Sequence, residues 1–264
     1  RLWYAAEELS LARALFINRL DRPDADFDVA MAALQDRFGS NLGAVTIPMG
    51  SGEAFSGIID VVHMKARHLE GGKPVVEDVP AEYAEAAEAA RAQLTELVVE
   101  ADDEIMMKYL EGEEVTQEEL EGLLAKAIRE RVFVPVFSGS CVREEGVISF
   151  MDAAVAWFPT MADFGRIPLV NGEQLDISED DERPVVFAFK SLNDPQNGRL
   201  SFLKVLAGTI TPGIELTNAR TRKTERLGHL YQMCGKETTD VASAAAGDIV
   251  VVPKLEAMTG DPLS

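Results

Sequence analysis

The chain has 264 residues, 47% of them hydrophobic and 27% charged, a composition that predicts a globular protein with a core and excludes disordered and collagen-like chains. Its 25 Lys and Arg against 45 Asp and Glu give a formal net charge of −20, which argues against a protein that binds nucleic acid over its whole surface. No apolar run reaches the ~18 residues of a membrane span and only two cysteines are present, so we expect a cytoplasmic protein of roughly two domains that does not bind membranes.

The first part of the chain predicts a helix end, a strand, a loop and a helix in succession. Residues 1–12 have the pattern of a helix already under way, so we expect the sequence to begin inside a longer protein. Ala14–Ile17 is a short apolar run, typical of a strand buried on both faces of a parallel sheet. The tetrapeptide Asn18-Arg19-Leu20-Asp21 follows it, and Phe27–Phe38 then carries a helical apolar stripe that Gly39 ends.

A second strand, loop and helix follow more than a hundred residues later. Val132–Phe137 is again a buried-strand run, Ser138-Gly139-Ser140 is its loop, and a helix is expected from about Val147 to Phe158. An insertion at about residues 44–130 therefore separates two copies of the same unit.

The insertion combines short strands with acidic helices. Ala44–Val62 predicts strands or hairpins, Ala81–Leu110 and Thr116–Glu130 predict helices, and Thr116 has capping-box spacing to Glu119. From Glu77 to Glu121 sixteen acidic residues stand against only two basic ones, Arg91 and Lys108. On composition alone this block is a solvated face.

The C-terminal part has a different pattern. Residues 161–182 have little periodicity and predict a linker that ends in the charge run Glu179–Arg183. Beyond it, short β-rich runs separated by turns predict a small all-β barrel over residues 183–264. The expected strands are Val185–Lys190, Leu200–Leu206, Gly213–Leu216, Arg226–Met233 and Ile249–Val252.

The two loops that follow the buried strands are the candidate site, because ligands of open parallel sheets bind beyond the carboxyl ends of the strands. A carboxylate such as Asp21 can accept hydrogen bonds from both the ring N–H and the exocyclic amine of guanine, a donor pair that adenine lacks. Asn18 is suited to brace the loop, and a backbone N–H beside Ser140, such as that of Cys141, can donate to the guanine carbonyl. Taken alone, Asn-x-x-Asp is a weak signal, since both residues favour loops.

The segment Phe16-Ile17-Asn18-Arg19-Leu20-Asp21-Arg22 resembles the guanine-recognition loop of translation elongation factor G. Further stretches along nearly the whole chain resemble the same family: Ile47–Gly50, Phe55–Asp60, Met64–Ala66, Tyr109–Glu114, Val134–Ser140, Phe187–Lys190, Asp194-Pro195, Gly198–Leu200, Gly247–Ile249 and Thr259–Asp261.

The resemblance implies an α/β fold: a partial P-loop-type GTPase domain over residues 1–160 that lacks its N-terminal half and carries an α+β insertion, then the linker and the barrel. It also implies guanine binding by Asn18, Arg19, Asp21, Ser140 and Cys141. Two of these residues depart from the family pattern, because Arg19 is found where the family has a Lys and Cys141 where it has an Ala. The departures favour a paralogue of elongation factor G, although the housekeeping factor stays open.

By the same resemblance, the parent protein binds GTP or GDP with Mg²⁺ and couples GTP hydrolysis to translocation or a related elongation step. Its phosphate-binding loop and magnesium-supporting Asp do not occur before Asn18, so we expect this chain alone to have no catalytic residues and no tight nucleotide binding. The implied partner is the ribosome. A stalk protein would contact the acidic insertion, and ribosomal RNA would contact the basic barrel cluster Arg220, Arg222, Lys223 and Arg226.

Two other functions stay open at this point. One is a ribosome-protection-type GTPase of the same superfamily, and the other is a stand-alone, non-enzymatic module that binds RNA or protein. His63, His68 and His229 have no companions at metal-ligand spacing, so no metal site is expected.

Overall fold

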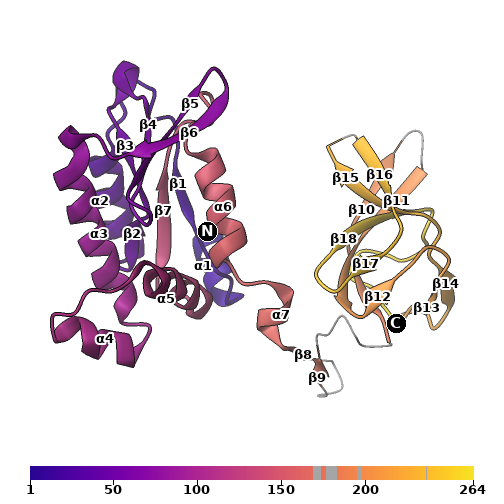
Figure 1. Ribbon diagram of the computed structural model, residues 1–264. Helices are drawn as coiled ribbons and strands as arrows, with labels where there is room; N and C mark the ends of the chain where they lie inside the picture. Colours follow the sequence, from indigo (N-terminus) through magenta and orange to yellow (C-terminus); the bar gives the residue numbers. More distant parts are fainter. Residues whose placement is uncertain (169–173, 177–182, 195–197, 236) are drawn as a thin grey trace. The chain divides into compact units, whose positions relative to one another are not determined.

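The chain forms two compact units in the computed structural model, which describes residues 1–168, 174–176, 183–194, 198–235 and 237–264. The first unit is Arg1–Pro159 and the second is Thr160–Ser264 (Figure 1). The domain boundary predicted from the sequence lies after residue 160, one residue further along the chain.

A three-stranded parallel sheet is the centre of the first unit. It has the order β1 (Leu15–Ile17), β7 (Val134–Ser138), β2 (Leu42–Ala44), with β7 in the middle. Every residue of β7 is buried, as its apolar sequence predicts. The expectation that β1 is buried on both faces is wrong: all three of its residues are only partly buried, because among the described strands β1 has one neighbour.

Helices α1 (Leu2–Glu8), α2 (Phe27–Phe38) and α6 (Val147–Trp157) accompany this sheet (Figure 1). The predicted bounds of α2 are confirmed. Asp26 caps its first turn by accepting a hydrogen bond from the Val29 N–H at 3.0 Å, and Gly39 ends it at a φ of 113°. The amide of Gln35 then donates to the Leu42 carbonyl at 3.1 Å, which ties α2 to β2.

An antiparallel sheet forms the first half of the insertion. Its order is β3 (Thr46–Met49), β4 (Gly57–Asp60), β5 (Lys65–Glu70), β6 (Lys73–Asp78), with a short 3₁₀ turn, η1 (Gly52–Ala54), between β3 and β4. The sequence predicts β3 and β4, but β5 and β6 carry no comparable apolar run. Their hairpin is closed by Gly71 and Gly72, whose φ values of 58° and 79° suit glycine.

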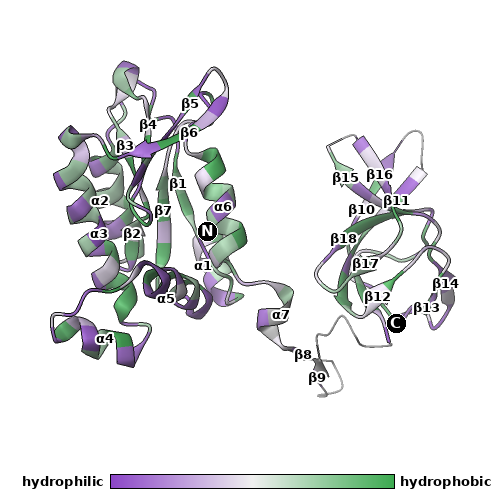
Figure 2. Ribbon diagram, in the orientation of Figure 1, coloured by the Kyte–Doolittle hydropathy of each residue, from purple (hydrophilic) through white to green (hydrophobic). Residues whose placement is uncertain are grey.

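The helices of the insertion are α3 (Ala84–Val99), α4 (Asp103–Leu110) and α5 (Gln117–Glu130), preceded by a 3₁₀ turn, η2 (Ala81–Tyr83). The helical pattern of Ala81–Leu110 is therefore broken, because Asp102 leaves the helix and caps α4 by accepting from the Glu104 and Ile105 N–H groups. The capping box of Thr116 and Glu119 at the start of α5 is confirmed. Figure 2 shows hydrophilic and hydrophobic residues alternating along α3 and α4.

Where the second unit is described, it consists of strands and their connections, apart from α7 (Met161–Phe164) at its start. A β8–β9 hairpin (Arg166–Pro168, Gln174–Asp176) falls in the predicted linker, whose residues 169–173 and 177–182 lie outside the described part. Six barrel strands form one sheet in the order β16 (Glu237–Val241), β15 (Leu230–Cys234), β18 (Ile249–Pro253), β11 (Gly198–Ala207), β10 (Val185–Asp194), β19 (Pro262–Leu263). Two pairs complete the unit: β12 (Thr209–Ile210) with β17 (Ala244–Ala245), and β13 (Glu215–Thr217) with β14 (Thr224–Arg226).

These strands enclose one apolar core. Leu203, Val205 and Ala207 alternate along β11 as fully buried residues, and the first two pack with Val250 and Val252 of β18. The predicted run Arg226–Met233 is divided between β14 and β15, and β16 lacks an apolar run that would predict it.

Candidate functional site

The first site loop begins where β1 ends. Asn18 accepts a hydrogen bond from the Arg19 N–H at 2.8 Å through its side-chain oxygen, which turns the chain sharply, and Arg19 takes a φ of 66°. Leu20 is buried against Phe55 and Ile58 of the inserted sheet. The buried side chain of Leu20 therefore holds the loop in place between the two polar residues Asn18 and Asp21.

The second site loop begins where β7 ends. Ser140 is fully buried, and its backbone N–H and C=O bond to the C=O and N–H of Glu145 at 3.0 and 3.1 Å. Gly139 and Gly146 bring the backbones of this loop close together: a Cβ at Gly139 would collide with the Glu145 carbonyl oxygen, and one at Gly146 with that of Ser138. The loop is therefore a closed and rigid turn.

The two loops contact each other directly, because β1 and β7 are parallel neighbours whose carboxyl ends meet. The Ser140 hydroxyl donates to Asp21 Oδ1 at 2.5 Å, and the Cys141 N–H donates to Asn18 Oδ1 at 2.9 Å. The Leu20 N–H also donates to the Gly139 carbonyl at 3.2 Å. The structure thus brings together Asn18, Asp21, Ser140 and Cys141, which are 119 or more residues apart across these side-chain contacts.

The two oxygens of Asp21 have different surroundings. Oδ1 accepts from Ser140 and from Arg19 Nε, the latter at 3.3 Å, whereas no side chain of the described residues donates to Oδ2. The Ser140 hydrogen bond is the largest cause that lowers the pKa of Asp21, with smaller contributions from the residue's own backbone N–H and from Arg19, so the carboxylate is ionised at neutral pH. The side chain is 13% exposed. Asp21 therefore has one oxygen, Oδ2, that no described side chain bonds, and Arg19 lies beside this carboxylate.

The predicted basic cluster lies on the β13–β14 hairpin of the second unit. Arg222, at a φ of 60°, and Lys223 are exposed at its turn, and Arg226 is exposed on β14. Arg220 differs from these three, because its guanidinium forms two hydrogen bonds to Asp261, at 2.6 and 2.8 Å. The structure therefore brings the four cations together, with Arg220 already ion-paired.

Two comparisons with known proteins bear on these sites. Residues 184–264 match the family model described as elongation factor G domain 2. A crystal structure of a protein from Thermus thermophilus is 31% identical, covers 99% of this chain and superposes with a TM-score of 0.84. The chain is elongation factor G-like. It spans 37% of the length of the Thermus protein.

In this elongation factor G-like chain, Asp261 is a structural residue that sequence reasoning missed. It is almost fully buried and accepts from Asn218 Nδ2 at 2.8 Å and from the Met258 N–H at 2.9 Å, in addition to Arg220. The Arg220 contact, followed by the Asn218 and Met258 bonds, holds the pKa of Asp261 far below its ordinary value. The sequence signal for it is the stretch Thr259–Asp261, which resembles the family but does not indicate the partner of Asp261.

A second polar cluster joins the inserted sheet to α5. His63 Nδ1 lies 2.8 Å from Asp60 Oδ2, and His63 Nε2 lies 3.3 Å from Glu121 Oε1. Arg67 contacts the same Asp60 oxygen at 2.9 Å. The Asp60 hydrogen bond is the largest cause that raises the pKa of His63. Among the described residues, no group of three or more His, Cys, Asp or Glu has a metal-binding arrangement.

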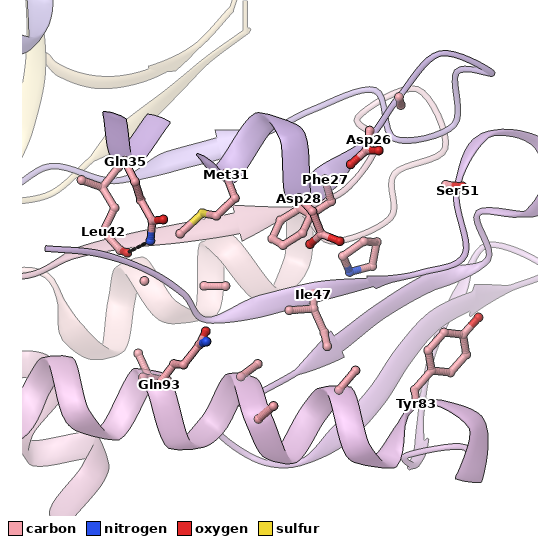
Figure 3. A pocket seen from close by; sticks show the side chains of 18 of the residues that line it. Asp26, Phe27, Asp28, Met31, Gln35, Leu42, Ile47, Ser51, Tyr83 and Gln93 are labelled. Atoms are coloured by element: carbon pink, nitrogen blue, oxygen red, sulfur yellow. Dashed lines mark hydrogen bonds between the residues drawn. The ribbon is translucent and has the colours of Figure 1, made fainter. Parts of the chain in front are cut away.

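A cavity of about 550 Å³ lies between α2, the β2–β3 segment and α3 (Figure 3). Met31 and Phe27 line it from α2, Ile47 from β3, and Gln93 from α3. Neither site loop contributes a residue to it. The cavity depends on packing between distant helices, so no sequence pattern predicts it. In the described part of the chain, no helix is long and apolar enough to span a membrane.

Proposed function

We propose that this chain carries the guanine-recognition part of a translational GTPase of the elongation factor G type. The proposal rests on one observation above all: Asp21 lies at the junction of the two loops, is ionised and fixed by the Ser140 hydroxyl, and has no side-chain donor on its Oδ2 among the described residues. A carboxylate held in this way accepts from two adjacent donors, and guanine has them in its ring N–H and exocyclic amine. Adenine has neither in that arrangement.

The other loop residues have supporting roles in this proposal. Asn18 spans both loops, because its side-chain oxygen accepts from Arg19 and from Cys141. The Cys141 N–H is the donor nearest to the position of the guanine carbonyl, and it exchanges its Asn18 partner for the base when nucleotide binds. The aliphatic part of Arg19 packs on the base once the guanidinium leaves Asp21.

Phosphate binding and hydrolysis belong to residues outside this sequence in our proposal. The 264 residues contain no Gly-x-x-x-x-Gly-Lys-[Ser/Thr] loop. The described residues also offer no cluster of ligands for the Mg²⁺ that accompanies a nucleoside triphosphate. The full-length protein would bind GTP or GDP with Mg²⁺, and would couple hydrolysis to translocation or a related step of elongation.

The ribosome is the proposed partner. The exposed Arg222, Lys223 and Arg226 would contact ribosomal RNA phosphates, which multiple unpaired cations on one hairpin favour. The acidic helices α3 and α4 would contact a stalk protein through the exposed Glu85, Glu88 and neighbouring carboxylates, which suit a basic partner.

The experiment measures GDP and XDP (xanthosine diphosphate) affinities of the full-length protein and its Asp21→Asn variant. An Asn amide donates to the carbonyl that xanthine has in place of the guanine amine, so we expect GDP binding to weaken about 100-fold and XDP binding to strengthen. The matched control is Asp24→Asn, because Asp24 lies in the same loop, is highly exposed and pairs only with Arg22 among the described residues. Unchanged guanine preference in Asp21→Asn would refute the proposal.

A further inference from the structure

The Ser140 loop forms two side-chain hydrogen bonds to the insertion. Glu145 Oε1 accepts a hydrogen bond from the Leu69 N–H of β5 at 2.9 Å. Arg143 Nη1 donates to the Phe55 carbonyl, which follows η1, at 2.6 Å. The two contacts span 76 and 88 residues of sequence, so neither is a consequence of the local turn.

The Asn18–Asp21 loop is fastened to the same part of the insertion. The Gly52 N–H donates to the Leu20 carbonyl at 2.9 Å, and the Leu20 side chain is buried with Phe55 and Ile58. Gly52 has a φ of 59°, and a Cβ there would lie only 3.2 Å from the backbone of Pro23. Both proposed guanine loops are therefore supported by the β3–β4 turn and the end of β5.

Glu145 is the most unusual member of these contacts, because it is a carboxylate with only 8% of its surface exposed. Burial raises its pKa, and the Leu69 N–H only partly offsets that effect. A buried acid is costly unless its hydrogen bond has a use. Here the residue links two elements: its side chain holds β5, and its backbone bonds twice to Ser140, whose hydroxyl holds Asp21.

We propose that Glu145 and Arg143 are positioning residues, through which the inserted sheet fixes Ser140, and with it the Asp21 carboxylate, in the orientation that distinguishes guanine. The inference rests on the proposed guanine-binding function and extends it. Glu145 acts through the Leu69 N–H of β5 and Arg143 through the Phe55 carbonyl. The insertion thereby supports base recognition as well as offering its acidic helices to a partner.

The expected effect is on discrimination as well as on affinity. Inosine diphosphate lacks the exocyclic amine of guanosine diphosphate, so the ratio of the two affinities measures how well Asp21 accepts from that amine. A shifted Ser140 lets the carboxylate rotate, and the ratio falls. A change that only loosens the fold weakens both nucleotides equally and leaves the ratio unchanged.

The experiment compares Glu145→Leu with Glu145→Gln in the full-length protein, with GDP and inosine diphosphate binding measured for each. We expect Glu145→Leu to lower the affinity ratio about tenfold, and Glu145→Gln, which keeps an oxygen acceptor for the Leu69 N–H, to retain most of it. Arg143→Met, which removes the donor to Phe55, should lower the ratio severalfold without removing a buried group. Glu144→Leu is the matched control, because Glu144 is the exposed neighbour and makes no side-chain hydrogen bond within the described residues.

A folded Glu145→Leu or Arg143→Met protein with an unchanged ratio would overturn the inference. If Glu145→Leu does not fold, Arg143→Met decides, because its side chain lies at the surface. The proposed function fails separately: a wild-type protein that binds GDP no better than ADP refutes guanine recognition itself.

Discussion

Asp21 in the first unit and Asp261 in the second are both carboxylates that fasten a loop, yet they differ in what they leave open. Asp261 uses both oxygens, accepting two bonds from Arg220 and one each from Asn218 and the Met258 N–H. Where the structure describes the chain, side chains donate to Asp21 at Oδ1 only, from Ser140 and Arg19. Both have a lowered pKa. A saturated carboxylate stabilises a fold, whereas a fixed carboxylate with an open oxygen is suited to bind a ligand.

The largest expected effect is on the stability of the barrel. Asp261→Ala removes the acceptor of the Met258 N–H and of Arg220, and leaves the buried Asn218 amide with Glu225 as its remaining acceptor. We therefore expect the free energy of unfolding of the second unit to fall by about 3 kcal/mol. Both tryptophans, Trp3 and Trp157, lie in the first unit. Urea unfolding of the chain should therefore shift when followed by circular dichroism and stay unchanged when followed by tryptophan fluorescence.

Asp21→Ala is the counterpart of that variant. We expect guanine-nucleotide affinity of the full-length protein to fall about 100-fold, since two charge-assisted hydrogen bonds to the base are lost. Urea unfolding of the 264-residue chain should change little by either probe. An Asp21→Ala chain as destabilised as Asp261→Ala would show that Asp21 is structural, and the comparison would fail.

The next effect concerns the cations near Asp261. Because Arg222 and Lys223 are exposed and without side-chain partners in the described residues, changing both to Glu should weaken ribosome binding by the full-length protein. The slope of log affinity against log salt concentration should also become shallower, by the amount that corresponds to about one to two lost phosphate contacts. Lys254→Glu, an exposed charge reversal elsewhere on the barrel, is the control. Equal binding by wild type and the double variant across a salt titration would exclude the hairpin as an RNA contact.

A smaller effect is expected from the His63 cluster. Its carboxylate, Asp60, resembles Asp261 in having partners on both oxygens. The folded-state pKa of His63 is raised above 6.5 by Asp60, with Glu121 contributing and Arg67 opposing. Its stabilisation is therefore complete below pH 6.5 and is lost as the pH rises through the higher folded-state value. The free energy of unfolding by tryptophan fluorescence should decline slightly above pH 6.5 in wild type. His63→Asn should flatten that decline, and an equally steep decline in the variant would contradict the assignment.

The smallest effect is expected at Arg19, whose ion pair with Asp21 is 47% exposed on the arginine side. Exposed pairs contribute little, so Arg19→Lys should change GDP affinity by no more than about threefold. An increase would indicate that the guanidinium competes with the base for Asp21. A loss of tenfold or more would instead show that the guanidinium itself, and not only the aliphatic part of Arg19, contributes to base binding.

The sequence predicts the elements that depend on local patterns. The bounds of α2 follow from the Asp26 cap and Gly39, and the start of α5 follows from the Thr116 capping box. Strands β6 and β16 are mostly exposed and β5 is mostly half-buried, so none of the three has the apolar run from which a strand is predicted. The contact of Ser140 with Asp21 could be anticipated from two parallel strands, since their carboxyl ends meet.

Long-range partners of single polar side chains could not be predicted. Nothing local to Asp261 indicates that its partner is Arg220, and nothing near Glu145 indicates Leu69. These contacts depend on how strands from distant parts of the chain are aligned. The same reasoning explains why Arg220 could be grouped with its exposed neighbours but not recognised as ion-paired.

A structure of the full-length protein with GDP tests the central claim most directly. We expect Asp21 to accept from the guanine ring N–H and exocyclic amine, with Oδ2 in one of these bonds, the Ser140 hydroxyl still on Oδ1 and the Arg19 guanidinium displaced. A guanine base bound elsewhere, with Arg19 still paired to Asp21 and Oδ2 facing solvent, would contradict the account.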